Sequence, residues 1–282
     1  GKTDFIPAKK LMIPVNKENV RKYHIVPEKD MDRVVDSVML EIQPDRIGKT
    51  DLIILDVLSN YDWDRPLYYV TPTCDVALGL ENWSQYNGFC YKFIPIRKQG
   101  DEQIVDENKM YDLLMSTYRL ASLDAEGVYY DYQNIYTFCA VIPLRDMFYN
   151  TARKFYENGD TARAVELLDR CIECMPAESF PYNISWLRSL NELSVLRIME
   201  LYLKCDRKEE AEKVARRFAE ETTKTLRYLT SPYGDDVISG KLAEDNFTLF
   251  SYMLDILETT GSKDLADALR ADLLVAIDNL AE

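Results

Sequence analysis

Residues 152–176 read ARKFYENGDTARAVELLDRCIECMP, and this stretch decides the fold of the longer part of the chain. Its second half places apolar side chains three and four residues apart, which is the spacing of one face of an α-helix. These side chains are Ala164, Leu167, Leu168, Cys171, Ile172 and Met175. A polar turn at 158–160 precedes this helix, and a longer apolar helix precedes the turn. The stretch therefore predicts a helical hairpin.

The same design recurs twice towards the C-terminus. Polar turns at 205–207 and 261–263 each lead into a helix with the same apolar spacing, at 211–219 and 265–277. The first hairpin matches the spacing of a tetratricopeptide unit through Ala152, Phe155, Gly159, Ala164, Leu168, Cys171 and Pro176. The later hairpins lack the final proline and are spaced more widely than the roughly 34 residues of a regular repeat. We therefore expect an irregular tetratricopeptide-like array, which is typical of a scaffold or docking surface.

The first hundred residues follow a different pattern. Short apolar runs predict strands at 11–15, 38–42, 67–70 and 89–96, with helices at 16–20 and 49–58, in a β-α-β rhythm. Seven of the eleven prolines lie here, and the acidic excess of the chain lies entirely after residue 100. We expect an α+β protein with a small α/β domain at 1–105, followed by an all-α array of helical hairpins at 106–282.

Charge and hydropathy exclude several functions. The net charge is −14, from 34 Lys and Arg against 48 Asp and Glu, so nucleic acid is not an expected partner. No segment approaches the roughly 20 apolar residues of a membrane span, and the N-terminus lacks the pattern of a signal peptide. We expect this part of the protein to lie in water.

Three motifs that could carry chemistry have simpler interpretations. Gly48-Lys49-Thr50 ends like a phosphate-binding loop but lacks the earlier glycine. The single histidine, His24, leaves no partner for the usual nucleophilic dyads. Cys171 and Cys174 form a Cys-x-x-Cys inside a helix, where Cys171 belongs to the apolar face. We expect unpaired cysteines, no metal, no cofactor and no catalytic residue; if one pair is bridged, Cys74 and Cys90 are the better candidates.

Two other patterns have both a functional and a purely structural interpretation. Asp62-Trp63-Asp64 is an Asp-x-Asp, by which many glycosyltransferases hold a metal and a sugar nucleotide, although a solvated turn gives the same pattern. Residues 61–93 hold the densest set of aromatic side chains, which could stack on sugars, accept a peptide, or fill the core of a small sheet. From this stretch we predict a binding surface made of Trp63, Arg65, Tyr68, Trp83 and Tyr86.

Several segments between residues 49 and 96 resemble one known family. They are Lys49–Leu52, Leu55–Asp56, Trp63–Tyr68 (WDRPLY), Gly79–Glu81 (GLE), Tyr86–Gly88 (YNG) and Pro95–Ile96. Together they are similar to the C-terminal region of a Bacteroidetes-type family of multi-pass membrane proteins described as protein O-mannosyltransferase-like. The resemblance implies a membrane-embedded parent that uses a lipid-linked sugar, with this region on the periplasmic side of the inner membrane. The catalytic acids of such enzymes lie between membrane helices, so none is carried over to this chain.

Three hypotheses follow from these observations. The first is a non-catalytic extracytoplasmic domain that binds acceptor polypeptides, partner subunits or glycans for a membrane glycosyltransferase. The second is a metal-dependent sugar-handling domain that uses Asp62 and Asp64. The third is a structural or dimerisation domain, in which the aromatic side chains are core.

Overall fold

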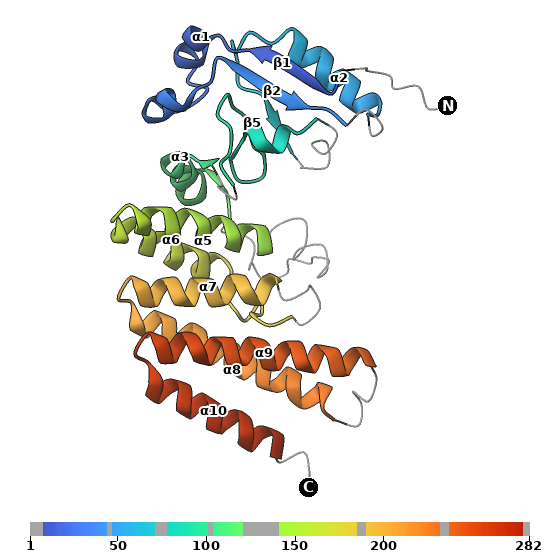
Figure 1. Cartoon of the computed structure of the whole chain (residues 1–282). Helices are drawn as coiled ribbons and strands as arrows, with labels where there is room; N and C mark the ends of the chain where they lie inside the picture. Colours follow the sequence, from blue (N-terminus) through green and yellow to red (C-terminus); the bar gives the residue numbers. More distant parts are fainter. Residues whose placement is uncertain are drawn as a thin grey trace. The chain divides into compact units, whose positions relative to one another are not determined.

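The computed structural model describes residues 8–43, 47–70, 78–100, 104–120, 141–184, 190–231 and 237–278. The chain divides into two compact units, Gly1–Met110 and Tyr111–Glu282 (Figure 1). The first unit combines short strands with short helices, whereas the described part of the second contains helices and no strand. The predicted α+β class is confirmed.

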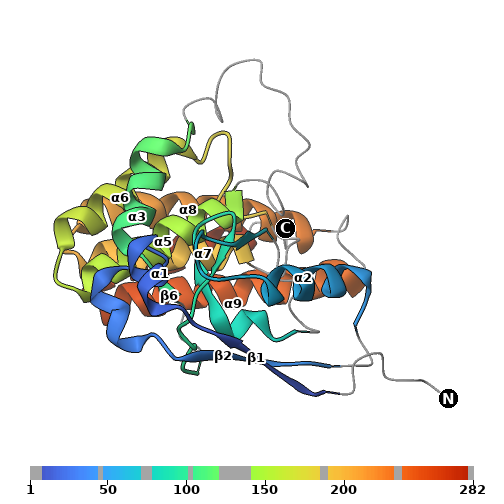
Figure 2. The ribbon, with the colours of Figure 1, turned by 90° about the horizontal axis from the view of Figure 1, so that it is seen from above.

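Two small sheets form the framework of the first unit. β1 (Lys10–Pro14) and β2 (Ser37–Glu41) pair as an antiparallel ribbon, and they run side by side in Figure 2. The second sheet has the order β3-β5-β4-β6, and only its β4–β6 pair is parallel. Its strands are β3 (Tyr68–Tyr69), β4 (Ser84–Tyr86), β5 (Tyr91–Phe93) and β6 (Ile104–Val105).

The strands expected at 67–70 and 89–96 exist but are shorter than predicted. β3 has two residues and β5 has three. The two strands that flank the helix at 49–58 belong to different sheets, β2 to the ribbon and β3 to the second sheet. The β-α-β order along the chain therefore does not produce a parallel β-α-β unit.

Helix caps fix the helices around these sheets. Asn16 begins α1 (Lys17–Lys22), since its side chain accepts a hydrogen bond from the Asn19 N–H at 3.1 Å. Asp51 similarly accepts from the Gly48 N–H at 2.7 Å at the start of α2 (Lys49–Ser59). The described residues of this unit also form the 3₁₀ turns Glu28–Arg33 and Leu80–Trp83, and α3 (Glu107–Asp112), which crosses the division between the units.

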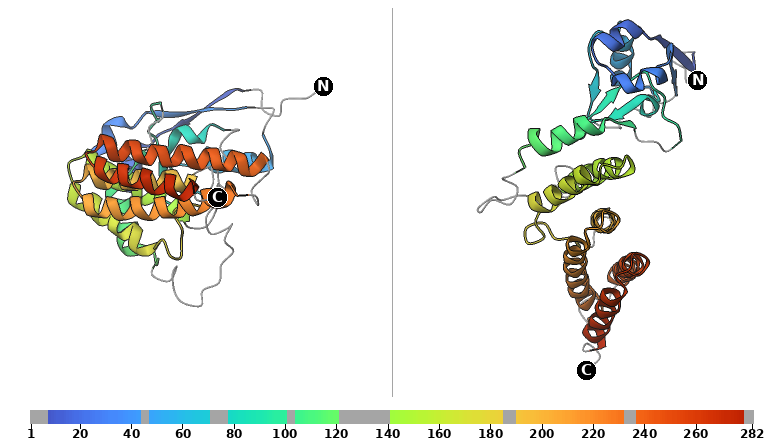
Figure 3. Two further views of the ribbon diagram at one scale, coloured as in Figure 1. Left: turned by 90° about the horizontal axis from the view of Figure 1, so that it is seen from below. Right: turned by 90° about the vertical axis from the view of Figure 1, so that its left-hand side faces the viewer.

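Three consecutive helical hairpins make up most of the second unit. They are α5 (Val141–Glu157) with α6 (Thr161–Cys174), α7 (Leu190–Lys204) with α8 (Lys208–Leu229), and α9 (Val237–Thr259) with α10 (Lys263–Asp278). A π-helical turn, η5 (Leu113–Thr117), comes before them. Within this unit the hairpins follow one another in chain order (Figures 1 and 3). The helical hairpins predicted from residues 152–176 and their recurrences are confirmed.

The three hairpin turns share one geometry. Each contains a residue in the left-handed region, with φ of 84° at Gly159, 61° at Asp206 and 86° at Gly261. In each turn the N–H of the next residue donates to the carbonyl five positions earlier, from Asp160 to Phe155, Arg207 to Tyr202 and Ser262 to Leu257. This bond closes a helix end around a left-handed residue. The turns are therefore three copies of one connection.

Small buried side chains let the first hairpin close. Ala152 of α5 and Ala164 of α6 are both fully buried, and their small side chains allow the two helices to pack closely. None of the helices in the described ranges is both long and apolar enough to cross a membrane.

Candidate functional site

Trp63 is a core residue and does not lie on the expected surface. Its side chain is 0% exposed, and its indole Nε1 donates to the Pro14 carbonyl at 2.8 Å. The ring stacks on Phe93 with centroids 5.2 Å apart and lies 4.8 Å from the Tyr61 ring. With its only donor satisfied by backbone, the indole joins the first sheet to the second.

Trp83 is also buried, with 4% of its side chain exposed. Its Nε1 donates to the Met39 carbonyl at 3.0 Å, which ties the second sheet to β2. The expectation that both tryptophans contribute to an exposed surface is therefore wrong. The physical reason is that a unit with strands of two to five residues needs large rings to fill its core.

Arg65 and Tyr68 are exposed, as expected. The Arg65 carbonyl accepts a hydrogen bond from the Tyr61 hydroxyl at 2.6 Å, which fixes the backbone and leaves the side chain at the surface. The Tyr68 hydroxyl accepts from Lys109 Nζ at 3.1 Å. Tyr68 pairs across the sheet with Lys92 of β5, whereas Tyr86 pairs with Tyr91. Tyr68 and Tyr86 therefore lie on opposite faces of the sheet.

Tyr86 belongs to a row of three tyrosines across the sheet. Tyr69 of β3, Tyr91 of β5 and Tyr86 of β4 are register partners and so point to one face. Neighbouring ring centroids are 5.5 Å apart in both steps, with Tyr69 stacked on Tyr91 and Tyr91 tilted against Tyr86. All three side chains are half-buried. The row offers an aromatic surface of which Tyr86 alone was predicted.

An apolar groove of about 180 Å³ lies between α2 and this sheet. It is lined by Ile53, Ile54, Val57, Leu58, Leu67, Tyr68, Tyr69, Leu80 and Phe93. Two of these side chains are unusually open for their type, Ile53 with 66% and Val57 with 44% exposed. Tyr69 belongs both to the groove and to the tyrosine row. Phe93 forms part of the lining and stacks on buried Trp63, so Trp63 packs against one wall of the groove.

The groove residues of α2 were missed by the sequence analysis, although a signal was present. Six of the eleven residues of α2 are apolar, namely Leu52, Ile53, Ile54, Leu55, Val57 and Leu58. Four of them, Leu52 to Leu55, are consecutive, and at 100° per residue they point to all sides of the helix instead of along one stripe. The helix therefore has an apolar face beyond the one that it buries.

Comparison with known proteins adds one finding about the same unit. Residues 1–111 match the family profile described as TMEM260-associated domain 2. The matched range ends within one residue of the first compact unit. Neither a curated protein nor a solved structure matches the chain. The similarity thus concerns the unit that carries the groove.

The Asp-x-Asp at 62–64 is part of a turn in the structure. The Asp62 carboxylate accepts hydrogen bonds from the side-chain amides of Asn16, at 3.1 Å, and Asn19, at 2.9 Å. These bonds attach the turn to the start of α1. In the part of the chain that the structure describes, no three His, Cys, Asp or Glu side chains form a group able to hold a metal ion.

The cysteines in the described ranges are free thiols. Cys171 and Cys174 lie buried in α6, and burial raises the pKa of the Cys171 thiol to about 12. A thiol with so high a pKa carries almost no thiolate at neutral pH, so it is a weak nucleophile and metal ligand. Cys90 is also free, while Cys74, its proposed partner, lies outside the described residues.

Lys92 makes the stability of the first unit depend on pH. Its ammonium is buried beside the sheet and donates to the His24 carbonyl at 3.2 Å. Burial, followed by repulsion from Lys109, lowers its pKa from 10.5 to about 8, although attraction to Asp106 opposes the shift. Between pH 8 and 10.5 the unfolded chain therefore holds more protons on this residue, and the free energy of unfolding rises with pH.

We expect Lys92→Met to remove this rise, because methionine fills a similar volume without a charge. The measurement is the urea midpoint of both proteins at pH 7.5, 9 and 10.5. Identical pH slopes in the two proteins would show that the ammonium of Lys92 is not buried as described.

Proposed function

We propose that the first unit is a non-catalytic interaction module of a glycosyltransferase-like membrane protein, and that its groove binds an extended segment of an acceptor polypeptide or partner subunit. The match to a TMEM260-associated domain supports the link to a protein O-mannosyltransferase-like parent. A periplasmic position and a tetratricopeptide-like role for the hairpins belong to the same proposal. They rest on the sequence resemblance.

The observation that carries the proposal is the position of the groove beside β3. In the described part of the sheet β3 pairs with β5 alone and is the first strand in the order. A sheet edge next to an apolar pocket suits an extended peptide, since main-chain hydrogen bonds provide affinity and the pocket selects side chains. The opposite wall is a helix with exposed Ile53 and Val57.

The lining also defines the side chains that the segment presents. The walls consist of aliphatic and aromatic groups, so apolar side chains lose the most water-exposed surface there. In an extended segment every second side chain points to the same face. We therefore expect a segment with apolar residues at alternate positions, whose outer end reaches the row from Tyr69 to Tyr86.

Replacing Ile53 with Asp tests this proposal. The ligand is a fluorescent decapeptide with leucine or valine at every second position and serine between, and the readout is fluorescence anisotropy. Ile53 is exposed in the free protein, and burying its side chain against the peptide contributes up to about 1.5–3 kcal/mol, whereas burying an aspartate there is unfavourable. We expect Ile53→Asp to raise Kd at least tenfold, since about 1.4 kcal/mol corresponds to a factor of ten.

Leu52→Asp is the matched control. Leu52 is a neighbouring exposed apolar residue of α2 that does not line the groove, so the same charge change should leave Kd within about twofold. Equal losses in both variants, or equal affinity for a peptide with its leucines and valines contiguous, would count against the groove as the site. A wild-type dimer that Ile53→Asp makes monomeric would instead favour the dimerisation hypothesis.

A further inference from the structure

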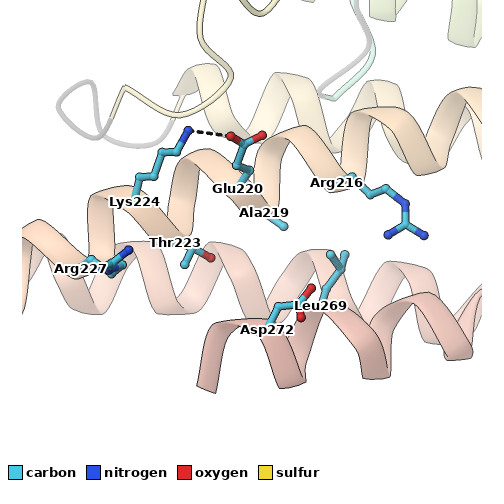
Figure 4. Close-up of a pocket in the computed structure, with 8 residues that line it drawn as sticks. All are labelled: Arg216, Ala219, Glu220, Thr223, Lys224, Arg227, Leu269 and Asp272. Carbon is cyan, nitrogen blue, oxygen red and sulfur yellow. Dashed lines mark hydrogen bonds and ion pairs between the residues drawn. The ribbon is translucent and has the colours of Figure 1, made fainter. Parts of the chain in front are cut away.

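A second groove, of about 370 Å³, lies in the helical unit between α8 and α10 (Figure 4). Six residues of α8 line it, Arg216, Ala219, Glu220, Thr223, Lys224 and Arg227, together with Leu269 and Asp272 of α10. Ala219 and Leu269 are buried and form its floor. The side chains of Leu269 and Asp272 rise from α10 towards α8, between Arg216 and Arg227.

The charge of this groove is opposite to that of the chain. Three of its side chains are cations and two are anions, in a protein with a net charge of −14. One cation is neutralised inside the groove, because Lys224 forms an ion pair with Glu220 at 2.6 Å. Asp272 is the remaining anion. Arg216 and Arg227 together exceed it by one positive charge.

Arg216 and Arg227 differ from most basic residues of the hairpin helices. The usual arrangement is an acid three or four positions away, as in the pair of Arg217 with Glu221 at 2.6 Å. Arg227 has Thr223, Lys224, Thr230 and Ser231 at those positions. Arg216 has Glu212 and Glu220 four positions away, but these acids form ion pairs with Lys208, at 3.9 Å, and Lys224, at 2.6 Å. Among the residues that the structure describes, no ion pair joins either Arg216 or Arg227 to an acid. Their guanidinium groups can therefore bind another carboxylate.

The spacing of the two arginines sets the length of what binds. They are separated by eleven positions on one helix, which at 1.5 Å per residue is about 16 Å. About five residues of extended chain cover that distance. A polypeptide chain can enter a recess between two helices. A flat membrane surface would contact only the residues at the edge of the recess.

We propose that the α8–α10 groove is a docking site for an acidic polypeptide segment with carboxylates about five residues apart, one on Arg216 and one on Arg227. Asp272, between them, repels any acid in the middle of the segment and accepts hydrogen bonds from its N–H groups. The site is independent of the groove at α2. The acidic charge of the remaining chain disfavours binding of such a segment elsewhere.

Two labelled peptides of equal composition test this proposal on the whole chain. Both are Gly/Ser nonapeptides with two glutamates, at positions 2 and 7 in one and at 2 and 3 in the other. We expect the first to bind at least fivefold tighter in 50 mM salt, and its affinity to fall as salt rises. Arg216→Glu with Arg227→Glu should raise its Kd at least tenfold, and Asp272→Asn should lower it.

The matched control is Lys241→Glu with Lys263→Glu. This pair changes the net charge equally, and both lysines are exposed outside the α8–α10 groove. If both double variants weaken peptide binding equally, the effect comes from the overall charge of the chain, and this result would overturn the proposal. So would equal affinity for the two peptides, or binding to phosphatidylglycerol vesicles that depends on both arginines while neither peptide binds. If the variant with Arg216→Glu and Arg227→Glu folds poorly, the change in Kd caused by Asp272→Asn still tests the proposal.

Discussion

Replacing Trp63 with alanine is expected to lower the free energy of unfolding of the first unit by about 3–5 kcal/mol. The indole is fully buried between Tyr61 and Phe93, so its removal leaves a large cavity. The substitution also leaves the Pro14 carbonyl without the hydrogen bond it accepts from Nε1. In addition, Trp63 has a φ of 57°, a conformation that a bulky residue adopts only where packing holds it.

The measurement is urea unfolding followed by far-UV circular dichroism, with the transition of the first unit fitted separately. Tyr68→Ala is the control, because that ring is exposed and its loss should cost less than about 1 kcal/mol. Trp63→Phe should fall between the two, since phenylalanine keeps a ring against Phe93 but has no donor. An alanine variant that stays as stable as wild type yet loses the decapeptide would show that Trp63 contacts the ligand directly.

The helical unit could be read from the sequence because its signals are local. The apolar spacing of α6 and the left-handed positions in the turns are visible in stretches of about 20 residues. Glycine marks two of these turns at 159 and 261. Asp206 takes the same conformation in the third, which aspartate tolerates better than most residues.

The sequence did not show which face of the sheet each aromatic side chain occupies, or whether that face is buried. Strands of two or three residues are too short for alternation to show which side is buried, so Tyr68 and Tyr86 looked equivalent. Whether a tryptophan is core or surface depended on contacts 44 and 49 residues away, with Met39 and Pro14. The groove itself exists only once α2 lies against the second sheet. Its one local sign was the run of four consecutive apolar residues, Leu52 to Leu55, on α2.

Arg145 was also missed, because an arginine in an amphipathic helix is normally assigned to the solvent face. In the structure it is buried in α5 and donates to the Asn191 side chain of α7 and to the Phe180 carbonyl, the latter at 2.8 Å. Its guanidinium lies 5.3 Å from the Tyr182 ring centroid. Asn191 in turn donates to the Tyr182 carbonyl at 2.8 Å.

These contacts hold the irregular segment 180–184, which joins the first hairpin to the second. Its backbone lacks the hydrogen bonds of regular structure and is satisfied by side chains of several helices. Glu221 of α8 accepts from the N–H groups of Tyr182 and Asn183, at 2.6 and 3.0 Å, and Glu192 of α7 accepts from that of Ile184 at 2.7 Å. Arg145 completes this set from α5, so all three helices meet at one segment.

Arg145→Met is therefore expected to destabilise the helical unit by about 2–5 kcal/mol, because two buried acceptors lose their donor at once. The segment should also open, so amide hydrogen exchange of Tyr182 and Asn183 should accelerate in the same variant. Lys154→Ala, on the same helix, removes an exposed ion pair with Glu157 at 3.5 Å and should cost less than about 1 kcal/mol. A double-mutant cycle with Asn191→Ala isolates the pair, and strict additivity would show that Arg145 and Asn191 do not act together in holding this segment.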